Sequence, residues 1–155
     1  MFSAFVAMLA MAWAGWPAPV ERTHAVYITF EGKPLLANAD GSPKAIEVWG
    51  LESPVFVDAQ TVPTPDKPLR FRASMDAADA FDRLVDARKP FDAEFCIYAE
   101  GTGRKLVRVV KLTGATILQR VRVAPGHGRE GGLANAPYVG LSVICKTVKA
   151  GPPKS

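Results

Sequence analysis

The chain has 155 residues, of which 48% are apolar and 22% are charged, and its formal net charge is +4. This length makes one ordinary domain that buries roughly 68–70% of its unfolded surface, so folding requires no metal or disulfide. The apolar content excludes a disordered chain, and the mild positive charge permits a polyanionic partner without demanding one. Thirteen glycines and thirteen prolines favour many turns and few long helices.

The first 21 residues form an apolar N-terminal segment that opens with MFSAFVAMLAMAWAGWP. This run is too short for a comfortable transmembrane helix, and no other long apolar run follows, so we expect no stable membrane insertion. Small residues near Ala14 and Ala18 are typical of a signal-peptide cleavage site, but the positive stretch that begins most secretory signals is missing. Three interpretations stay open: a cleaved signal peptide, an apolar extension used in packing or assembly, and a misplaced start codon.

Strands and turns are predicted for the first half of the chain. Residues 24–30 (HAVYITF) alternate and are rich in β-branched and aromatic side chains, which indicates a strand. A turn cluster at 38–44 separates it from a second strand at 45–52, which can continue after a bend as 55–60. The three prolines within 61–68 predict an exposed, semi-rigid loop.

One amphipathic helix interrupts the strands. Residues 69–73 alternate, with Arg70 and Arg72 outward, and the apolar period then changes to that of a helix. Ser74 stands where an N-cap belongs, and Pro90 ends the helix. The predicted apolar face consists of Ala77, Ala78, Phe81, Leu84 and Val85.

The second half of the chain returns to strands joined by glycine-rich turns. The predicted strands are 91–100, 106–112, 115–123 and 138–148. A hairpin turn lies at 101–105, a short break opens at Gly114, and a long loop spans 124–137. We therefore predict a mainly β domain over residues 22–149, followed by a polar tail at 150–155. Its fold class is an antiparallel β-barrel of seven or eight strands with one short α-helix on its side, because closure removes open edges.

The two cysteines, Cys96 and Cys145, carry no zinc signature, because no CxxC pair or Cys/His cluster accompanies them. Cys145 alternates with apolar residues, which indicates a buried and inert thiol. A disulfide between the two is the alternative, and it requires an oxidising compartment and facing strands.

Nothing in the sequence indicates catalysis, so we predict that the protein is not an enzyme and has no catalytic residue, metal or cofactor. His24 opens a strand and His127 lies in a glycine loop, and neither has a carboxylate or nucleophile at a telling spacing. The stretch GHGREGG lacks the GK[ST] ending of a phosphate loop, and a strand follows it. The helix also carries four aspartates, which indicate a solvated charged face rather than a metal site: Asp76, Asp79, Asp82 and Asp86.

Basic residues gather in the strands after the helix: Arg104, Lys105, Arg108, Lys111, Arg120 and Arg122. Arg120 and Arg122 project from one face of their strand, and Val121 and Val123 from the other. Aromatic residues that would stack on bases are missing between these cations, so nucleic-acid binding is not expected. The alternative is a charged wall that faces water, such as a channel lining or a rim contact.

The order of elements resembles the Hcp (hemolysin-coregulated protein) family, the tube protein of type VI secretion. Three stretches carry the resemblance: RFRASMDAADAFDRLVDARKPFDAEFCIYAE, RVVKLTGATILQRVRV and YVGLSVICKTVKA. The resemblance covers about residues 24–149. The chain departs from the family pattern at Ala78, where serine is common, and at Tyr138, where glutamate is common. The apolar N-terminus has no counterpart there.

The resemblance implies a tube subunit of a type VI secretion system or a related phage-derived injection system. Such subunits form homo-hexameric rings that stack into a hollow tube, with sheath and spike proteins as partners and effector cargo in the lumen. The protein would be cytoplasmic and then secreted through the apparatus, with the charged face of its helix outside the ring. The candidate lumen-facing residues are Arg108, Arg120 and Arg122. The candidate ring-contact residues in loops are Thr61, Pro63, Pro65, Asp66, His127, Arg129 and Glu130.

Two other functions compete with the tube subunit. An exported periplasmic or secreted β-barrel binding module is favoured if residues 1–18 are a cleaved signal peptide. A small enzyme or a nucleic-acid-binding barrel has little support from the residues.

Overall fold

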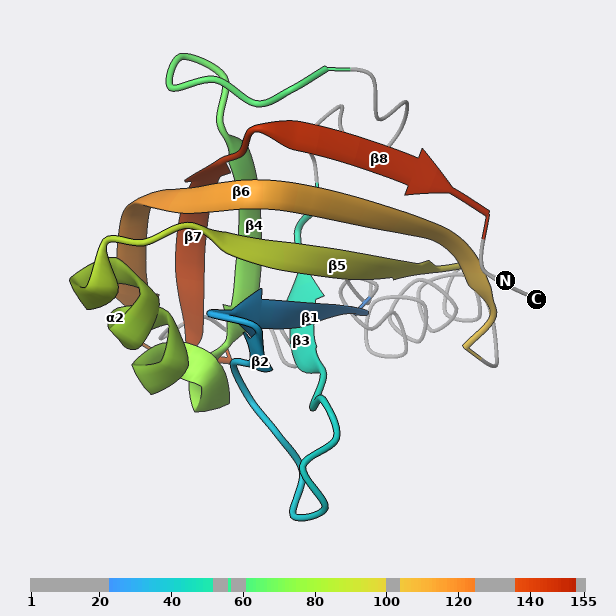
Figure 1. Cartoon of the computed structure of the whole chain (residues 1–155), viewed down its shortest axis with the longest axis horizontal. Helices are drawn as coiled ribbons and strands as arrows, with labels where there is room; N and C mark the ends of the chain where they lie inside the picture. The colour runs from blue at the N-terminus through green and yellow to red at the C-terminus, as the bar shows by residue number, and fades with distance from the viewer. Residues whose placement is uncertain (1–22, 52–55, 57–60, 100–103, 125–135, 153–155) are drawn as a thin grey trace, which may run out of the picture.

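The computed structural model describes residues 23–51, 56, 61–99, 104–124 and 136–152. They form eight strands and one α-helix (Figure 1). The strands are β1 (His24–Phe30), β2 (Lys33–Pro34), β3 (Ile46–Trp49), β4 (Leu69–Ser74), β5 (Phe91–Tyr98), β6 (Leu106–Val123), β7 (Tyr138–Ile144) and β8 (Thr147–Gly151). A 3-10 turn, η2 (Met75–Ala77), leads into the helix α2 (Ala78–Ala87).

Six strands close into an antiparallel barrel in the order β1–β3–β4–β7–β6–β5, and β5 pairs back with β1. The other two strands lie outside this ring, since β2 pairs with β1 and β8 pairs with β6. In Figure 1, β1, β5, β8 and the first part of β6 form one layer, and β3, β4 and β7 cross behind it. The predicted antiparallel barrel of seven or eight strands, with one short helix on its side, is confirmed.

Strand β6 belongs to both layers because it is 18 residues long. Its first half pairs with β5 and β8, and its second half pairs with β7. At Gly114, where φ is +64°, two residues of β6 oppose the single residue Asp92 of β5, whose Oδ1 accepts the Gly114 N–H at 3.0 Å. The predicted break at Gly114 is thus wrong. The glycine forms a β-bulge that bends the strand and lets pairing continue.

The last predicted strand, 138–148, is two strands. β7 and β8 are separated by Cys145 and Lys146, and the Lys146 N–H donates to the Thr113 carbonyl at 2.9 Å, so pairing with β6 resumes in β8. β8 runs to Gly151, two residues beyond the predicted end of the domain at 149. Sequence alternation alone does not reveal this interruption, because the apolar pattern passes through it.

Helix α2 starts one turn later than predicted. Ser74 Oγ accepts the Asp76 N–H at 3.4 Å, but the first turn is 3-10 rather than α-helical. The helix ends at Ala87, and Arg88 then takes a left-handed conformation (φ +54°), two residues before Pro90. The predicted apolar face is buried at Ala77, Ala78, Phe81 and Leu84.

The core fills the barrel and continues under α2, beside the bend in β6 (Figure 1). Phe95 of β5 is at its centre and only 1% exposed. Its ring lies edge-on to Phe56 and Phe71, with centroids 5.0 and 5.1 Å away. Phe81 and Leu84 of α2 belong to the same cluster, so the helix is a packing element of the barrel.

Several predictions fall outside the described residues: the apolar segment 1–21, the strand 55–60 apart from Phe56, the first three residues of the 101–105 turn, and nearly all of the 124–137 loop. Among the helices that the structure does describe, none combines the length and apolar character needed to cross a membrane.

Candidate interaction surfaces

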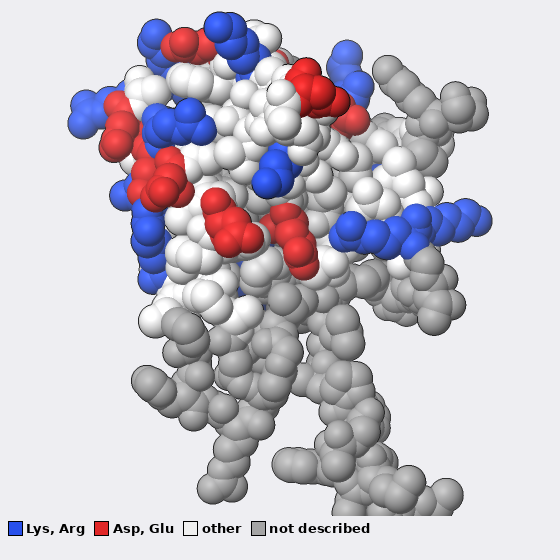
Figure 2. All heavy atoms as spheres, turned by 90° about the horizontal axis from the view of Figure 1, so that it is seen from below, with Lys and Arg blue, Asp and Glu red and all other residues white. Residues whose placement is uncertain are grey.

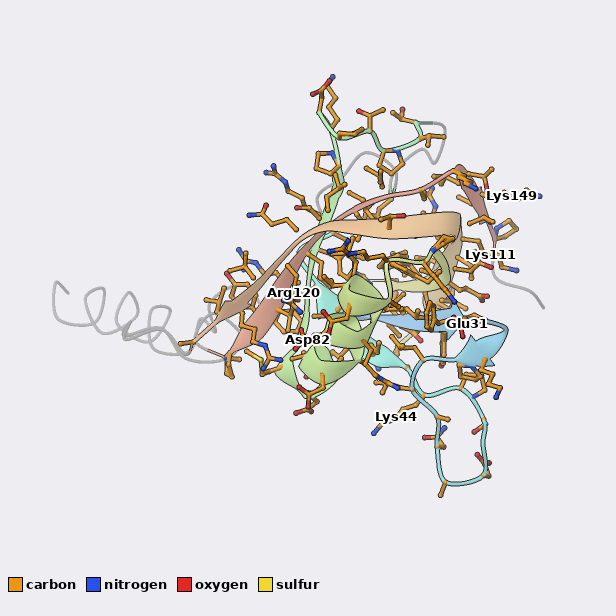
Figure 3. All side chains as sticks on the ribbon, turned by 60° about the vertical axis from the view of Figure 1, so that its left-hand side comes forward. Glu31, Lys44, Asp82, Lys111, Arg120 and Lys149 are labelled. Carbon is orange, nitrogen blue, oxygen red and sulfur yellow. The ribbon has the colours of Figure 1, made fainter. Side chains whose placement is uncertain are left out.

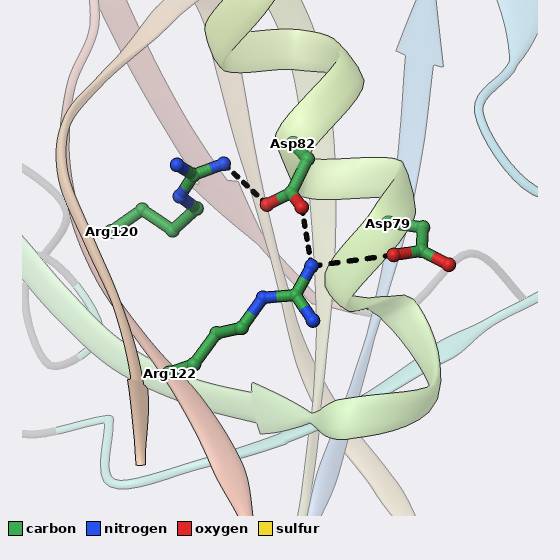
Figure 4. Close-up of polar contacts among 4 residues, drawn as sticks. All are labelled: Asp79, Asp82, Arg120 and Arg122. Atoms are coloured by element: carbon green, nitrogen blue, oxygen red, sulfur yellow. Dashed lines mark hydrogen bonds and ion pairs between the residues drawn. The ribbon is translucent and has the colours of Figure 1, made fainter.

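Arg120 and Arg122 point toward α2 (Figure 4), and Figure 3 shows Arg120 beside Asp82 of that helix. The register of β6 shifts between Ile117 and Gln119, so Leu118 is an extra residue in the strand. After this bulge, Arg120 and Arg122 oppose the buried residues of β7. The bulge therefore turns both arginines to the inner side of the sheet, where the helix lies.

Asp82 on α2 binds both arginines. Arg120 Nη1 donates to Asp82 Oδ1, and Arg122 Nη2 donates to Asp82 Oδ2 (Figure 4). Arg122 Nη2 also donates to Asp79 Oδ1 at 3.3 Å. The Asp82 side chain is 28% exposed and that of Asp79 is 98% exposed, so solvent screens the Asp82 contacts less. These contacts fasten the second half of β6 to the helix.

The same contacts shift two pKa values. The hydrogen bond from Arg122 is the main cause that lowers the pKa of Asp82, and the charge of Arg120 adds to it. The pKa of Arg122 is raised, chiefly by the hydrogen bond that it donates to Asp82. Arg83, on the same helix, donates from Nη2 to the Leu35 carbonyl at 3.1 Å. Three arginines thus tie α2 to segments distant in the sequence.

The Asp82→Asn variant is expected to unfold at a lower temperature than the original chain at pH 7. A carboxylate whose pKa is lowered by folding stabilises the fold above its unfolded pKa of about 3.9, and this contribution is lost as the pH falls through the folded value. The difference in melting temperature should therefore shrink below a pH of about 4 and also shrink in high salt. Thermal unfolding followed by circular dichroism from pH 2 to 8 measures it. A difference that is constant over this range would contradict the ionic origin.

Arg108 lies apart from the other two candidate lumen residues. It is in the first half of β6, and its Nη1 donates to the Phe56 carbonyl at 2.8 Å. The structure brings Arg120 and Arg122 together through Asp82, and it places Arg108 elsewhere on the strand. A lumen-facing position for the three arginines stays a prediction.

The predicted ring-contact loop 61–68 projects from the barrel above β4 in Figure 1. Thr64 and Lys67 exchange backbone hydrogen bonds of 3.2 and 3.0 Å, which form a tight turn at its tip. Pro63 is buried, whereas Thr61, Pro65 and Asp66 are exposed. Contact with another subunit stays a prediction for this loop. The other candidates, His127, Arg129 and Glu130, lie outside the described residues.

A groove of about 380 Å³ lies on the outer face of β4, β7 and β6. Two rows of directly paired residues cross it. One row is Arg70, Ser142 and Gln119, and the other is Arg72, Gly140 and Val121. Gly140 occupies the centre without a side chain, which leaves the surface hollow. Sequence alternation predicts that Arg70 and Arg72 point outward, but only the strand pairing shows that Arg72 lies in the row of Gly140 and Val121, and Arg70 in the row of Ser142 and Gln119.

Tyr138 closes one end of this groove. The Arg72 guanidinium carbon lies 4.9 Å from the centre of the Tyr138 ring, a cation–π contact. The same ring lies edge-on to Trp49, with centroids 6.3 Å apart. The side chains of Arg72 and Tyr138 are therefore held in place by these contacts, and together they bound the groove on this side.

The turn cluster predicted at 38–44 is a projecting arm, which we define as residues 37–43 (lower part of Figure 1). Ala37 and Pro43 form a bridge at its base, and Asn38 N–H donates to the Ser42 carbonyl at 2.8 Å. At the tip, Asp40 Oδ1 accepts the Ser42 N–H at 2.9 Å. The density of turn-forming residues predicts a turn here, but it does not show that the turn projects from the barrel as a candidate interaction site.

Cys96 and Cys145 are both free and buried. Burial raises the pKa of Cys145 to about 11 and also raises that of Cys96. Because the thiolate is the reactive form, burial lowers the reactivity of both side chains at neutral pH. The predicted burial of Cys145 is confirmed. Within the described ranges no three His, Cys, Asp or Glu side chains are grouped to hold a metal ion.

The class defined by these features is a closed six-stranded antiparallel barrel with one helix packed on its side. Solved structures of Hcp proteins have the same fold. Hcp1 from E. coli EAEC 042 aligns with a TM-score of 0.55 and 13% identity, over 84% of this chain and 99% of that chain. Hcp1 from Salmonella typhimurium aligns with a TM-score of 0.54 and 14% identity, over 86% of this chain and 88% of that chain.

A third similar structure is the secreted protein Hcp3 from Pseudomonas aeruginosa, with a TM-score of 0.54 and 10% identity over 85% of this chain and 99% of that chain. No protein-family model matches the sequence, and no curated protein matches it either. At these low identities the likeness establishes the fold. The Hcp-like architecture predicted from the sequence is thereby confirmed.

Proposed function

We propose that the chain is a structural tube subunit of a type VI secretion system or a related contractile injection system. The observation that supports this most directly is the match of barrel and helix to Hcp1 structures over 84% and 86% of the chain. A fold hosts more than one function, so the proposal needs a test of assembly. In this role the protein carries no catalytic chemistry, and its surfaces for contact with other copies are its functional sites.

In the proposed assembly, six copies form a ring and the rings stack into a hollow tube that carries effectors. Sheath and spike proteins are the expected partners, and the subunit is made in the cytoplasm before it leaves through the apparatus. A ring of identical copies joined head to tail needs two different contact surfaces on each subunit. The 61–68 loop and the 124–137 loop are the proposed contacts between rings.

The contacts of α2 restrict the proposed orientation of the subunit. If the charged face of α2 lies outside the ring, Arg120 and Arg122 cannot line the lumen, because both bind Asp82 on that helix. Arg108 is compatible with an outward helix, since it lies in the other half of β6 and donates to the Phe56 carbonyl. If Arg120 and Arg122 do face the lumen, the helix must line it too.

Purified protein is expected to form rings or stacked tubes, because the proposed subunit functions only as an assembly. Negative-stain electron microscopy shows the ring, and multi-angle light scattering gives the number of copies. A single monomeric species at high protein concentration in both measurements would rule out the tube subunit.

An exported β-barrel binding module is the second candidate function. The groove favours it, because about 380 Å³ is within the range of ligand-binding clefts, roughly 300–1,000 Å³. Intact-mass measurement of the protein from its own host separates the two functions. Removal of residues 1–18 by a signal peptidase would count strongly against the tube subunit and favour the exported module.

A further inference from the structure

We propose that the arm, residues 37–43, of one copy of this chain docks into the β4–β7–β6 groove of a second copy. The inference rests on the proposed function, since it assigns one of the contacts that join the subunits. The shape, rigidity and charge of the arm favour a second copy of the chain as the occupant of the groove.

The groove suits a narrow polypeptide segment that carries a negative charge. Gly140 leaves its centre open, and Val121, which is 45% exposed, gives it an apolar floor. Arg70 and Arg72 supply positive charge along the β4 side. Each guanidinium has five N–H donors, so it can bind a carboxylate in addition to the contacts it already makes.

The arm has the matching form and charge. Its tip consists of Ala39, Asp40, Gly41 and Ser42, all with small side chains. Asp40 uses Oδ1 for both of its bonds to Ser42, and among the described residues Oδ2 accepts none. These hydrogen bonds lower the pKa of Asp40, so the tip keeps its negative charge at neutral pH.

The arm is also held in one conformation before it meets a partner. Asn38 Nδ2 donates to Ser42 Oγ at 3.0 Å, the Gly41 N–H donates to the Asn38 carbonyl at 2.9 Å, and the Lys44 N–H donates to the Leu36 carbonyl at 2.9 Å. A segment that is already ordered loses little conformational entropy on binding. The base of the arm is fixed as well, because Arg83 holds the carbonyl of the buried Leu35.

The arm–groove contact must join two different copies of the chain. The described residues that line the groove come from β4, β6, β7 and the end of β3, and none of them belongs to the arm. Arm and groove are different surfaces, so their contact is heterologous and generates either a closed ring or an open filament. On the face seen from below, acidic and basic side chains are interspersed among the described residues (Figure 2).

A disulfide cross-link tests the contact directly. We place cysteines at Asp40 and Val121 in one chain (Asp40→Cys and Val121→Cys) and oxidise the assembled protein mildly. The expected product is a ladder of covalent multimers on a reducing-agent-free gel. The matched control carries Asp86→Cys with Val121→Cys, since Asp86 is an exposed helix carboxylate outside arm and groove, and it should give no ladder. The natural cysteines are buried and should not react.

A charge reversal gives a second readout without new cysteines. Asp40→Lys should weaken self-association by at least about tenfold, because like charges then meet at Arg70 and Arg72. Asp86→Lys, with the same change of charge, should leave self-association unchanged. If the original chain assembles and neither the ladder nor the weakening appears, the arm–groove contact is wrong and the tube subunit stands. If the original chain never assembles, both proposals fail.

Discussion

Phe95→Ala is expected to lower the free energy of unfolding by about 3–5 kcal/mol, the largest effect of any single change considered for this chain. Phe95 is 1% exposed and lies edge-on to Phe56 and Phe71. Truncation removes the apolar surface of the ring, leaves a cavity between the two layers of the barrel, and ends both aromatic contacts.

Urea unfolding followed by tryptophan fluorescence measures this loss. Val107→Ala is the matched control, because Val107 is 45% exposed on β6 and its truncation should change the unfolding free energy by less than about 0.5 kcal/mol. Phe95→Leu keeps most of the side-chain volume, so its loss of unfolding free energy should lie between those of Phe95→Ala and Val107→Ala. Equal losses for Phe95→Ala and Val107→Ala would show that Phe95 is not at the centre of the core.

Gly114→Val is expected to destabilise the protein by about 1–3 kcal/mol through backbone strain. The glycine has φ +64°, which a β-branched residue adopts only at a cost. A Cβ atom there would also lie 2.9 Å from Cδ of Lys146, although that flexible side chain can move away. The strain therefore comes mainly from the backbone.

Gly114→Asn separates the two causes. Asparagine tolerates the left-handed conformation, so this variant should lose clearly less stability than Gly114→Val, although it also adds a Cβ atom. Midpoints of urea unfolding at equal slope give the comparison. Equal losses for the two variants would assign the cost to contact with Lys146 instead of to φ.

The helix shows how far local sequence information reaches. Its buried face, the capping role of Ser74 and its end before Pro90 follow from spacing and from side-chain chemistry within one segment. The contacts of its charged residues do not follow in this way. An Asp79–Arg83 pair fits the helix spacing, but Arg83 binds the Leu35 carbonyl and Asp79 binds Arg122. These partners come from the packing of distant strands.

The course of strand β6 is likewise not predictable from its local sequence alone. A glycine between two alternating runs is as consistent with a turn as with a bulge, and only the pairing with β5 at Leu112 and again at Ala115 decides between them. The groove is hidden from the sequence for a similar reason. Arg72 and Gly140 are far apart in the chain, and they become neighbours only through the register of β4 with β7.

The pairing of β1 with β5 has a consequence for how the protein is made. Ala25 pairs with Cys96, so the strand that covers this edge of β1 is synthesised long after β1 itself. Until then one edge of β1 has no strand to bind, and such non-local pairing forms slowly. Codon changes that slow synthesis between β3 and β5 should therefore lower the soluble yield, although the native stability of the chain is unchanged.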